Sequence, residues 1–88
     1  MFNRFVRKKT ANALIYFFYH PDDYISNGGK EANITYSYIS NLIYDCKKEK
    51  LLKTEKSGRT TKINLTEKGE DIAKLLIKLK DKLGDTNG

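Results

Sequence analysis

The chain has 88 residues, enough for one small domain, and 39% of them are hydrophobic, enough for one compact core. Its 17 Lys and Arg against 11 Asp and Glu give a formal net charge of +6, which favours a polyanionic partner, either nucleic acid or an anionic membrane surface. A single cysteine, Cys46, excludes an internal disulfide. No run of 18 apolar residues occurs, and the apolar run 13–19 lacks a small-residue cleavage site, so neither a spanning helix nor a signal peptide is predicted.

The first predicted helix spans 10–20, and residues 1–9 before it form either a basic arm or its first turns. Apolar residues recur there at helical spacing: Ala11, Leu14, Ile15 and Phe18. Thr10 is a candidate cap, and the helix ends at His20 because the residue before a proline is driven out of the α region. Phe17 and two tyrosines make the helix apolar on more than one side. That pattern indicates a second buried contact such as a dimer surface, unless these aromatic residues are simply exposed.

A short second helix is predicted over 27–33, after a turn and a short extended piece. Ser26 or Asn27 supplies its cap. The consecutive glycines Gly28 and Gly29 are poor helix formers and need an explanation. Either another helix crosses too closely for a side chain, or free N–H groups at this helix start bind a phosphate, and the steric interpretation is favoured.

The helix predicted over 35–49 organises the rest of the chain. One face is buried because its apolar residues fall at i, i+3, i+4 and i+7: Ile39, Leu42, Ile43 and Cys46. The opposite face carries hydrogen-bonding and cationic side chains: Ser37, Asn41, Tyr44 and Lys48, with Ser40 on its edge. Thr35 is a natural N-cap, because its hydroxyl can accept from a free backbone N–H of the first turn. Such a face suits the major groove of DNA, although an ordinary solvated helix surface is the alternative.

A two-stranded hairpin is predicted over 51–65, with a turn over 55–60 in which Gly58 is available for a positive φ. Its cations are Lys56 and Arg59 near the tip and Lys62 behind them. Helix, tight turn, second helix and hairpin is the order of a winged helix-turn-helix. The predicted fold class is therefore mainly α with a small β-hairpin, completed by a long C-terminal helix.

That last helix is predicted over 66–83, with Thr66 as its N-cap and a polar tail over 84–88. Apolar residues step by four, three and four along it, as in a helix that packs along another helix. The partner is either the first helix of the same chain or the same helix of a second copy. A homodimer is favoured, because the chain has more apolar helix surface than a monomer of this size needs. The predicted dimer contacts are Phe2, Phe5, Phe17, Ile72, Leu76, Leu79 and Leu83.

Residues 35–69 resemble the second half of a MarR-like winged helix-turn-helix domain, a type common in prokaryotic transcription regulators. Three motifs carry the resemblance: ITYSYISNLIYDCKKEKLL as recognition helix and strand, Ser57-Gly58-Arg59 as wing tip, and LTEKG, from Leu65 to Gly69, as the strand-to-helix junction. With the two preceding helices, the likeness covers about 10–83.

The sequence departs from that family at three points. Gly28 and Gly29 stand where the family has an apolar and a small residue, and Lys50 replaces a frequent glycine after the recognition helix. The additional terminal helices of full-length members are missing, so no small-molecule ligand is predicted.

The resemblance and the charge distribution predict a DNA-binding protein rather than an enzyme. No Cys and His pair, metal-ligand spacing or glycine-rich phosphate loop occurs, so no catalytic residue, metal or cofactor is predicted. The predicted function is sequence-specific binding of double-stranded DNA by a small dimeric transcription regulator, cytoplasmic and nucleoid-associated, with no membrane partner. Two alternatives stay open: an architectural protein that coats DNA with weak specificity, and a winged-helix adaptor for other proteins.

The predicted DNA contacts divide by their role. Base edges in the major groove would be read by Ser37, Asn41 and Tyr44, and asparagine can pair bidentately with adenine. Sugar and phosphate contacts would come from Thr35, Tyr38, Ser40 and Lys48. At the wing, Arg59 would enter or skirt the minor groove, and the backbone contacts would be Lys56, Thr60 and Lys62. Cations on both helix and hairpin favour DNA over an adaptor, which would present apolar residues there.

Overall fold

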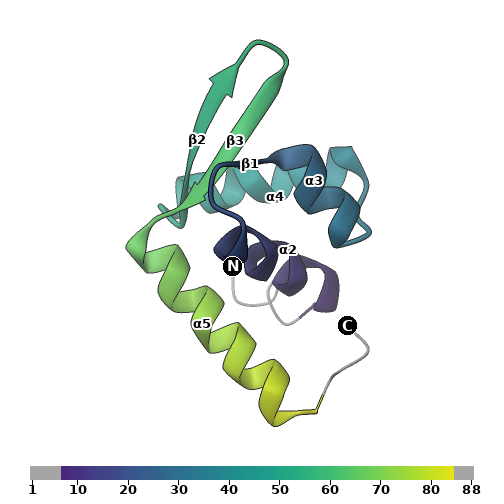
Figure 1. Cartoon of the computed structure of the whole chain (residues 1–88), viewed down its shortest axis with the longest axis vertical. Coiled ribbons are helices and arrows are strands. Elements are labelled where there is room, and N and C mark those ends of the chain that lie inside the picture. The colour runs from purple at the N-terminus through teal and green to yellow at the C-terminus, as the bar shows by residue number, and fades with distance from the viewer. Residues whose placement is uncertain (1–6, 85–88) are drawn as a thin grey trace.

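The computed structural model of the protein describes residues 7–84, a range that excludes the predicted dimer residues Phe2 and Phe5 (Figure 1). Its elements follow the order α2 (Lys8–Tyr19), β1 (Asp23–Tyr24), α3 (Ile25–Glu31), α4 (Tyr36–Lys48), β2 (Leu52–Ser57), β3 (Thr60–Leu65) and α5 (Glu67–Lys82). In Figure 1 the hairpin of β2 and β3 projects from one end of the molecule and α5 extends toward the other. The predicted fold class, helices with a small sheet arranged as a winged helix-turn-helix, is confirmed.

The core lies where α2, α3, α4 and the base of the sheet meet. Helix α4 contributes all four residues of its predicted buried face, and none of them is more than 6% exposed. At about 2 kcal/mol for each large apolar side chain removed from water, this face is a main source of stability. The buried apolar residues are Ala13, Leu14, Phe17, Ile25, Ala32, Ile39, Leu42, Ile43, Cys46, Leu51, Leu52, Ile63 and Ala73.

The sheet has three antiparallel strands in the order β1-β3-β2, one strand more than the predicted hairpin. In β1, Asp23 pairs with Ile63 of β3, while β2 and β3 pair along their full length from Leu52 and Leu65 to the tip. The turn is only two residues long, not the predicted 55–60. Gly58 there has φ 61°, at the first turn position, where a type II′ hairpin requires glycine.

Helix ends agree with the sequence at α4 and α5 and differ at α2 and α3. The hydroxyls of Thr35 and Thr66 accept from Tyr38 and Gly69 N–H, both at 3.2 Å, so both are caps. Thr10 is no cap: it lies inside α2, 1% exposed, and its hydroxyl donates to a backbone carbonyl one turn earlier. Helix α3 begins before Ser26 and Asn27, at Ile25, with Tyr24 in the cap position.

Both helices of the helix-turn-helix end in the same left-handed motif. After α4, Lys50 N–H donates to Lys47 carbonyl at 3.0 Å and Leu51 N–H donates to Cys46 carbonyl at 2.9 Å. Lys50 has φ 61°, a conformation in which glycine is favoured. Lys50, where the sequence departs from the family pattern, therefore adopts a left-handed conformation that glycine would adopt more easily. Asn33, with φ 57°, has the corresponding place after α3.

Phe17 lies in the core, and its prediction as a dimer contact is wrong. The side chain is 2% exposed and fills the space beside Gly28 of α3, where an added Cβ would lie 2.2 Å from the ring. This close approach of α2 and α3 supports the steric interpretation at Gly28, whereas an added Cβ at Gly29 would meet Ile39 of α4 at 3.1 Å. The aromatic residue that does face solvent on α2 is Tyr19, which is 61% exposed.

Candidate nucleic-acid interface

The predicted base-reading residues form one exposed face of α4. Ser37, Asn41, Tyr44 and Lys48 are all exposed, and Tyr38 and Ser40 are half-buried on its edges. Their common orientation follows from burial of the opposite face in the core. Thr35, also exposed, uses its oxygen to accept the cap hydrogen bond, so its hydroxyl proton is left to donate to a phosphate oxygen.

Tyr44 and Lys48 are one turn apart and interact. The Lys48 ammonium nitrogen lies 5.8 Å from the centre of the Tyr44 ring, a cation–π distance, and Tyr44 is 64% exposed. The ring therefore helps to hold the cation at the outer surface of the helix. Tyr36, in the first turn, is also 60% exposed and was not among the residues predicted from the sequence. The spacing gave no signal for it, because Tyr36 lies three residues before Ile39 and seven before Ile43 and so falls near the apolar face of α4.

The wing presents its cations at its outer end. Lys56 and Arg59 are exposed and Lys62 is half-buried nearer the body, where it pairs in register with Glu55 of β2. The Thr60 hydroxyl donates to the Ser57 carbonyl at 2.8 Å across the turn. Its proton is thus used within the hairpin, so the predicted phosphate contact of Thr60 would have to replace this bond.

A second set of hydrogen bonds fastens the base of the wing to the body. Asp22 N–H donates to Asn64 Oδ1 at 2.8 Å, and Asn64 Nδ2 donates back to Asp22 Oδ1 at 2.7 Å. Asp22 has φ 62°, so the backbone adopts an unfavourable conformation where these bonds form. The pair joins the segment after α2 to β3, 42 residues along the chain.

The adjacent Asp23 fastens β1 to α2 and α3. Its carboxylate accepts from the Tyr16 hydroxyl and, at 2.7 Å, from Asn27 Nδ2. The hydrogen bond from Tyr16 is the main reason that the pKa of Asp23 is lowered, and the same bond raises the pKa of Tyr16 to about 12. These anchors could not be predicted from the sequence, since a two-residue strand carries no period-two pattern.

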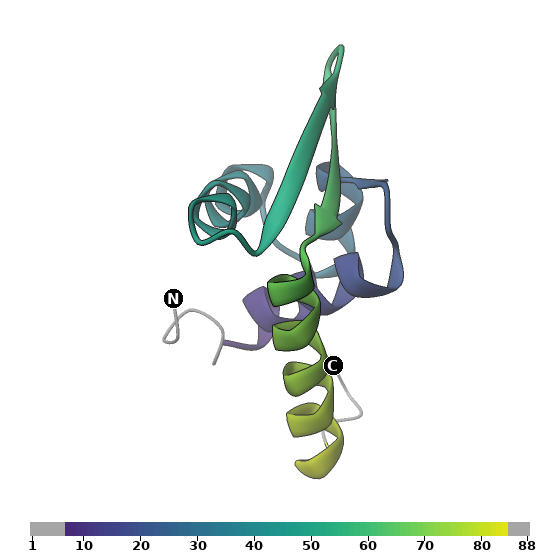
Figure 2. The ribbon, with the colours of Figure 1, turned by 90° about the vertical axis from the view of Figure 1, so that its left-hand side faces the viewer.

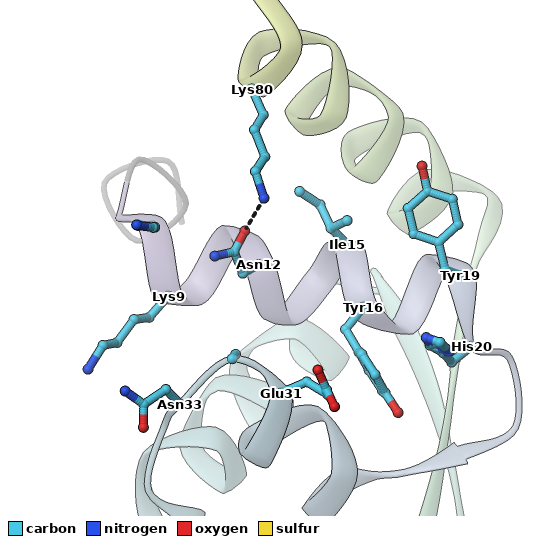
Figure 3. A pocket seen from close by; sticks show the side chains of 11 residues that line it. Lys9, Asn12, Ile15, Tyr16, Tyr19, His20, Glu31, Asn33 and Lys80 are labelled. Atoms are coloured by element: carbon cyan, nitrogen blue, oxygen red, sulfur yellow. Dashed lines mark hydrogen bonds between the residues drawn. The ribbon is translucent and has the colours of Figure 1, made fainter. Parts of the chain in front are cut away.

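A hollow of about 580 Å³ lies between α2, α3 and the end of α5. Figure 3 shows Tyr16, Glu31 and Asn33 on one side of α2 and Lys80 on the other, where its ammonium donates to Asn12 at 3.2 Å.

Within residues 7–84, no group of three acidic, cysteine or histidine side chains is placed to hold a metal ion. Among the helices of the same range, none is both long and apolar enough to cross a membrane.

Figure 2 shows how the two parts of the interface are arranged. Helix α4 is seen along its axis at one edge of the molecule, and the hairpin rises beside it. A cationic β-ribbon next to a helix with a polar outer face is an arrangement that can place the helix in the major groove while the ribbon follows the backbone.

Comparisons with protein-family models and with curated proteins find no match. Solved structures do match. The crystal structure of AF1382 from Archaeoglobus fulgidus has a TM-score of 0.81 and 28% identity, covering 88% of this chain and 89% of that one. The Staphylococcus aureus MepR–DNA complex has a TM-score of 0.76 and 20% identity, covering 88% of this chain. Streptococcus pneumoniae FabT in complex with DNA has a TM-score of 0.74 and 19% identity, also covering 88%.

The chain spans 59% of the MepR chain and 56% of the FabT chain in these two complexes, so the likeness concerns one part of each. The protein therefore has the MarR-like winged helix-turn-helix fold that MepR and FabT share.

Proposed function

We propose that the protein is a small dimeric transcription regulator that binds double-stranded DNA sequence-specifically. The observation that carries the proposal is the exposed polar face of α4 beside a hairpin whose tip is cationic. In this arrangement α4 enters the major groove, Arg59 enters or skirts the minor groove next to it, and Lys56 contacts the phosphate backbone. The net charge of +6 adds long-range attraction to the same partner.

The neighbouring structures support the same proposal. MepR is a transcription regulator, and both MepR and FabT have been solved bound to DNA. Because their identity to this chain is 20% and 19%, they support the mode of binding and not a target sequence. We also propose that the protein is not an enzyme and that it acts in the cytoplasm.

Within α4 we assign base reading to Ser37, Asn41 and Tyr44, since these side chains lie on the outermost line of the helix. Asn41 is the residue best suited to discriminate, because its amide offers one donor and one acceptor to adenine in a fixed geometry. Thr35, Tyr38, Ser40 and Lys48 lie closer to the helix edges or its ends, and we assign them to sugar and phosphate.

The test compares Asn41→Ala with Arg59→Ala. A preferred duplex is first selected from random sequences, and each variant is then titrated on that duplex, on one with a mutated site and on a scrambled one. Asn41→Ala should lose about 1–3 kcal/mol of discrimination at one or two base pairs. Arg59→Ala should weaken binding to all three duplexes and reduce the slope of log K against log salt by about one.

The same experiment separates the alternatives. If selection yields no motif while the protein still binds every duplex, the architectural role replaces the regulatory one. Absence of binding at 50 mM salt would contradict DNA binding of either kind and favour a protein adaptor. Equal weakening of all three duplexes by Asn41→Ala would show that this residue does not read bases.

A further inference from the structure

Three consecutive cations stand at the start of α2, beside the start of α4 and away from the wing. Arg7, Lys8 and Lys9 are all exposed, and the first turn of α2 contains no acidic residue. In Figure 2 the first turn of α2 lies on one side of α4 and the hairpin lies on the other. Helix α4 is therefore flanked by positive charge on both sides.

These cations share a groove with the start of the recognition helix. The groove has a volume of about 450 Å³, and the turn and first residues of α4 line its other wall: Asn33, Ile34, Thr35 and Tyr38. Figure 3 shows the Lys9 side chain extending from α2 toward the turn that carries Asn33. Thr35 and Tyr38, two of the phosphate contacts assigned above, thus lie at the edge of the same groove.

The lining identifies the chemistry of the occupant. It combines three cations with hydroxyl and amide groups and includes no carboxylate. Such a surface repels cations and attracts a chain of phosphates. In B-DNA the major groove is about 12 Å wide and is bordered by one phosphate strand on each side, so a helix placed in it meets a strand on both of its flanks.

Building on the proposed function, we infer that Arg7, Lys8 and Lys9 form a second backbone clamp, which holds the phosphate strand on the flank of α4 that the wing does not reach. The wing and this clamp then grip the two strands that border one major groove. Contacts of this kind fix the position of α4 and add affinity that does not depend on sequence.

The test removes two of the three cations as Arg7→Gln/Lys9→Gln. The hydrogen bond from Thr10 to residue 7 uses the backbone carbonyl, so the substitution keeps it. The matched control is Lys74→Gln/Lys78→Gln, which removes the same charge from exposed positions on α5. The test variant should reduce the salt slope by about two and weaken preferred and scrambled duplexes by the same factor, whereas the control should leave the slope nearly unchanged.

Hydroxyl-radical footprinting on the preferred duplex locates the effect. The test variant should lose protection on one backbone segment, and Arg59→Ala should lose it on a different segment across the same major groove. Equal salt slopes for the test and control variants, or loss of the same segment in both footprints, would overturn the clamp. So would a variant that binds DNA normally but loses binding to vesicles containing anionic lipid. Failure of the unmodified protein to bind any duplex would instead reject the proposed function, and the clamp with it.

Discussion

Gly28 and Gly69 are required for a steric reason at the scale of single residues. A Cβ on Gly69 would lie 1.9 Å from the Leu51 carbonyl oxygen, where the start of α5 crosses the chain entering β2. A backbone oxygen cannot rotate away, so the glycine of the LTEKG motif is explained by the contact alone. At Gly28 the obstacle is a side chain, the Phe17 ring, and this difference can be tested.

Gly28→Ala should cost about 1–3 kcal/mol of folding free energy, because Phe17 is buried and must shift. Phe17→Leu removes the ring and should be destabilising alone. Combined, the two substitutions should cost less than the sum of their separate losses, since the smaller side chain leaves room for the new methyl group. Urea unfolding of the four proteins measures this coupling, and strictly additive losses would show that the Phe17 contact is not the reason for Gly28.

Residue types predicted local structure well where the interaction is local. Thr35 and Thr66 cap their helices and Gly58 has a positive φ, each through contacts within a few residues. Thr10 had the same residue type as a cap but is inside a helix, because Arg7 before it already occupies the cap position. Residue type alone could not distinguish a capping threonine from one inside the helix, since a threonine in the first turn can also donate to a preceding carbonyl.

At the scale of elements, α4 was predictable because its buried residues repeat at a fixed spacing. Strand β1 was not, because two residues give no pattern and its partner β3 lies some 40 positions away. Strand β1 matters because it supports the wing. An isolated two-stranded hairpin is marginally stable, and here β1 and the Asp22–Asn64 pair hold its base.

Asn64→Ala should therefore loosen the wing without altering its charge. Amide hydrogen exchange in β1 and β3 should accelerate, and DNA affinity should fall by less than in Arg59→Ala. In the Arg59→Ala background, adding Asn64→Ala should have little further effect on affinity, because the residue it helps to place is gone. Asn12→Ala, which removes a hydrogen bond to Lys80 away from the wing, is the control. Independent losses of affinity from Asn64 and Arg59 would contradict this positioning role.

At the scale of the whole molecule, the wing and the free part of α5 lie at opposite ends of a body 40 Å long (Figure 1). The predicted apolar seam of α5 divides along its length. Ile72 and Leu76 pack against the core of their own chain, whereas Leu79 and Leu83 are 54% and 73% exposed. Leu75, 66% exposed, extends that outer stripe at i, i+4 and i+8. The sequence predicted an apolar helix but could not divide its residues between core and surface.

The outer stripe limits how strong a dimer can be. Burying the exposed parts of these three leucines in each of two copies would contribute roughly 6–12 kcal/mol, at about 1.5–3 kcal/mol for each fully buried leucine side chain. Association itself costs on the order of 4–15 kcal/mol. On this estimate the proposed dimer would dissociate on dilution, and it would form through the end of the molecule that is remote from the proposed DNA-binding face.

Leu79→Gln/Leu83→Gln should convert the proposed dimer into a folded monomer. Both leucines lie outside the core, so replacing them does not disturb the packing within one chain. Leu76→Gln should instead lower the folding free energy, since it places an amide against the core. Sedimentation over a range of concentrations with urea unfolding of the same samples distinguishes the two effects, and Lys74→Gln/Lys78→Gln should change neither.

On DNA, the monomeric variant should bind a single half-site about as well as the unmodified protein does, but lose the added affinity for a palindrome whose half-sites are one helical turn apart. A native protein that sediments as a monomer at every concentration would contradict the dimer, and the exposed stripe would then have to be explained by another partner.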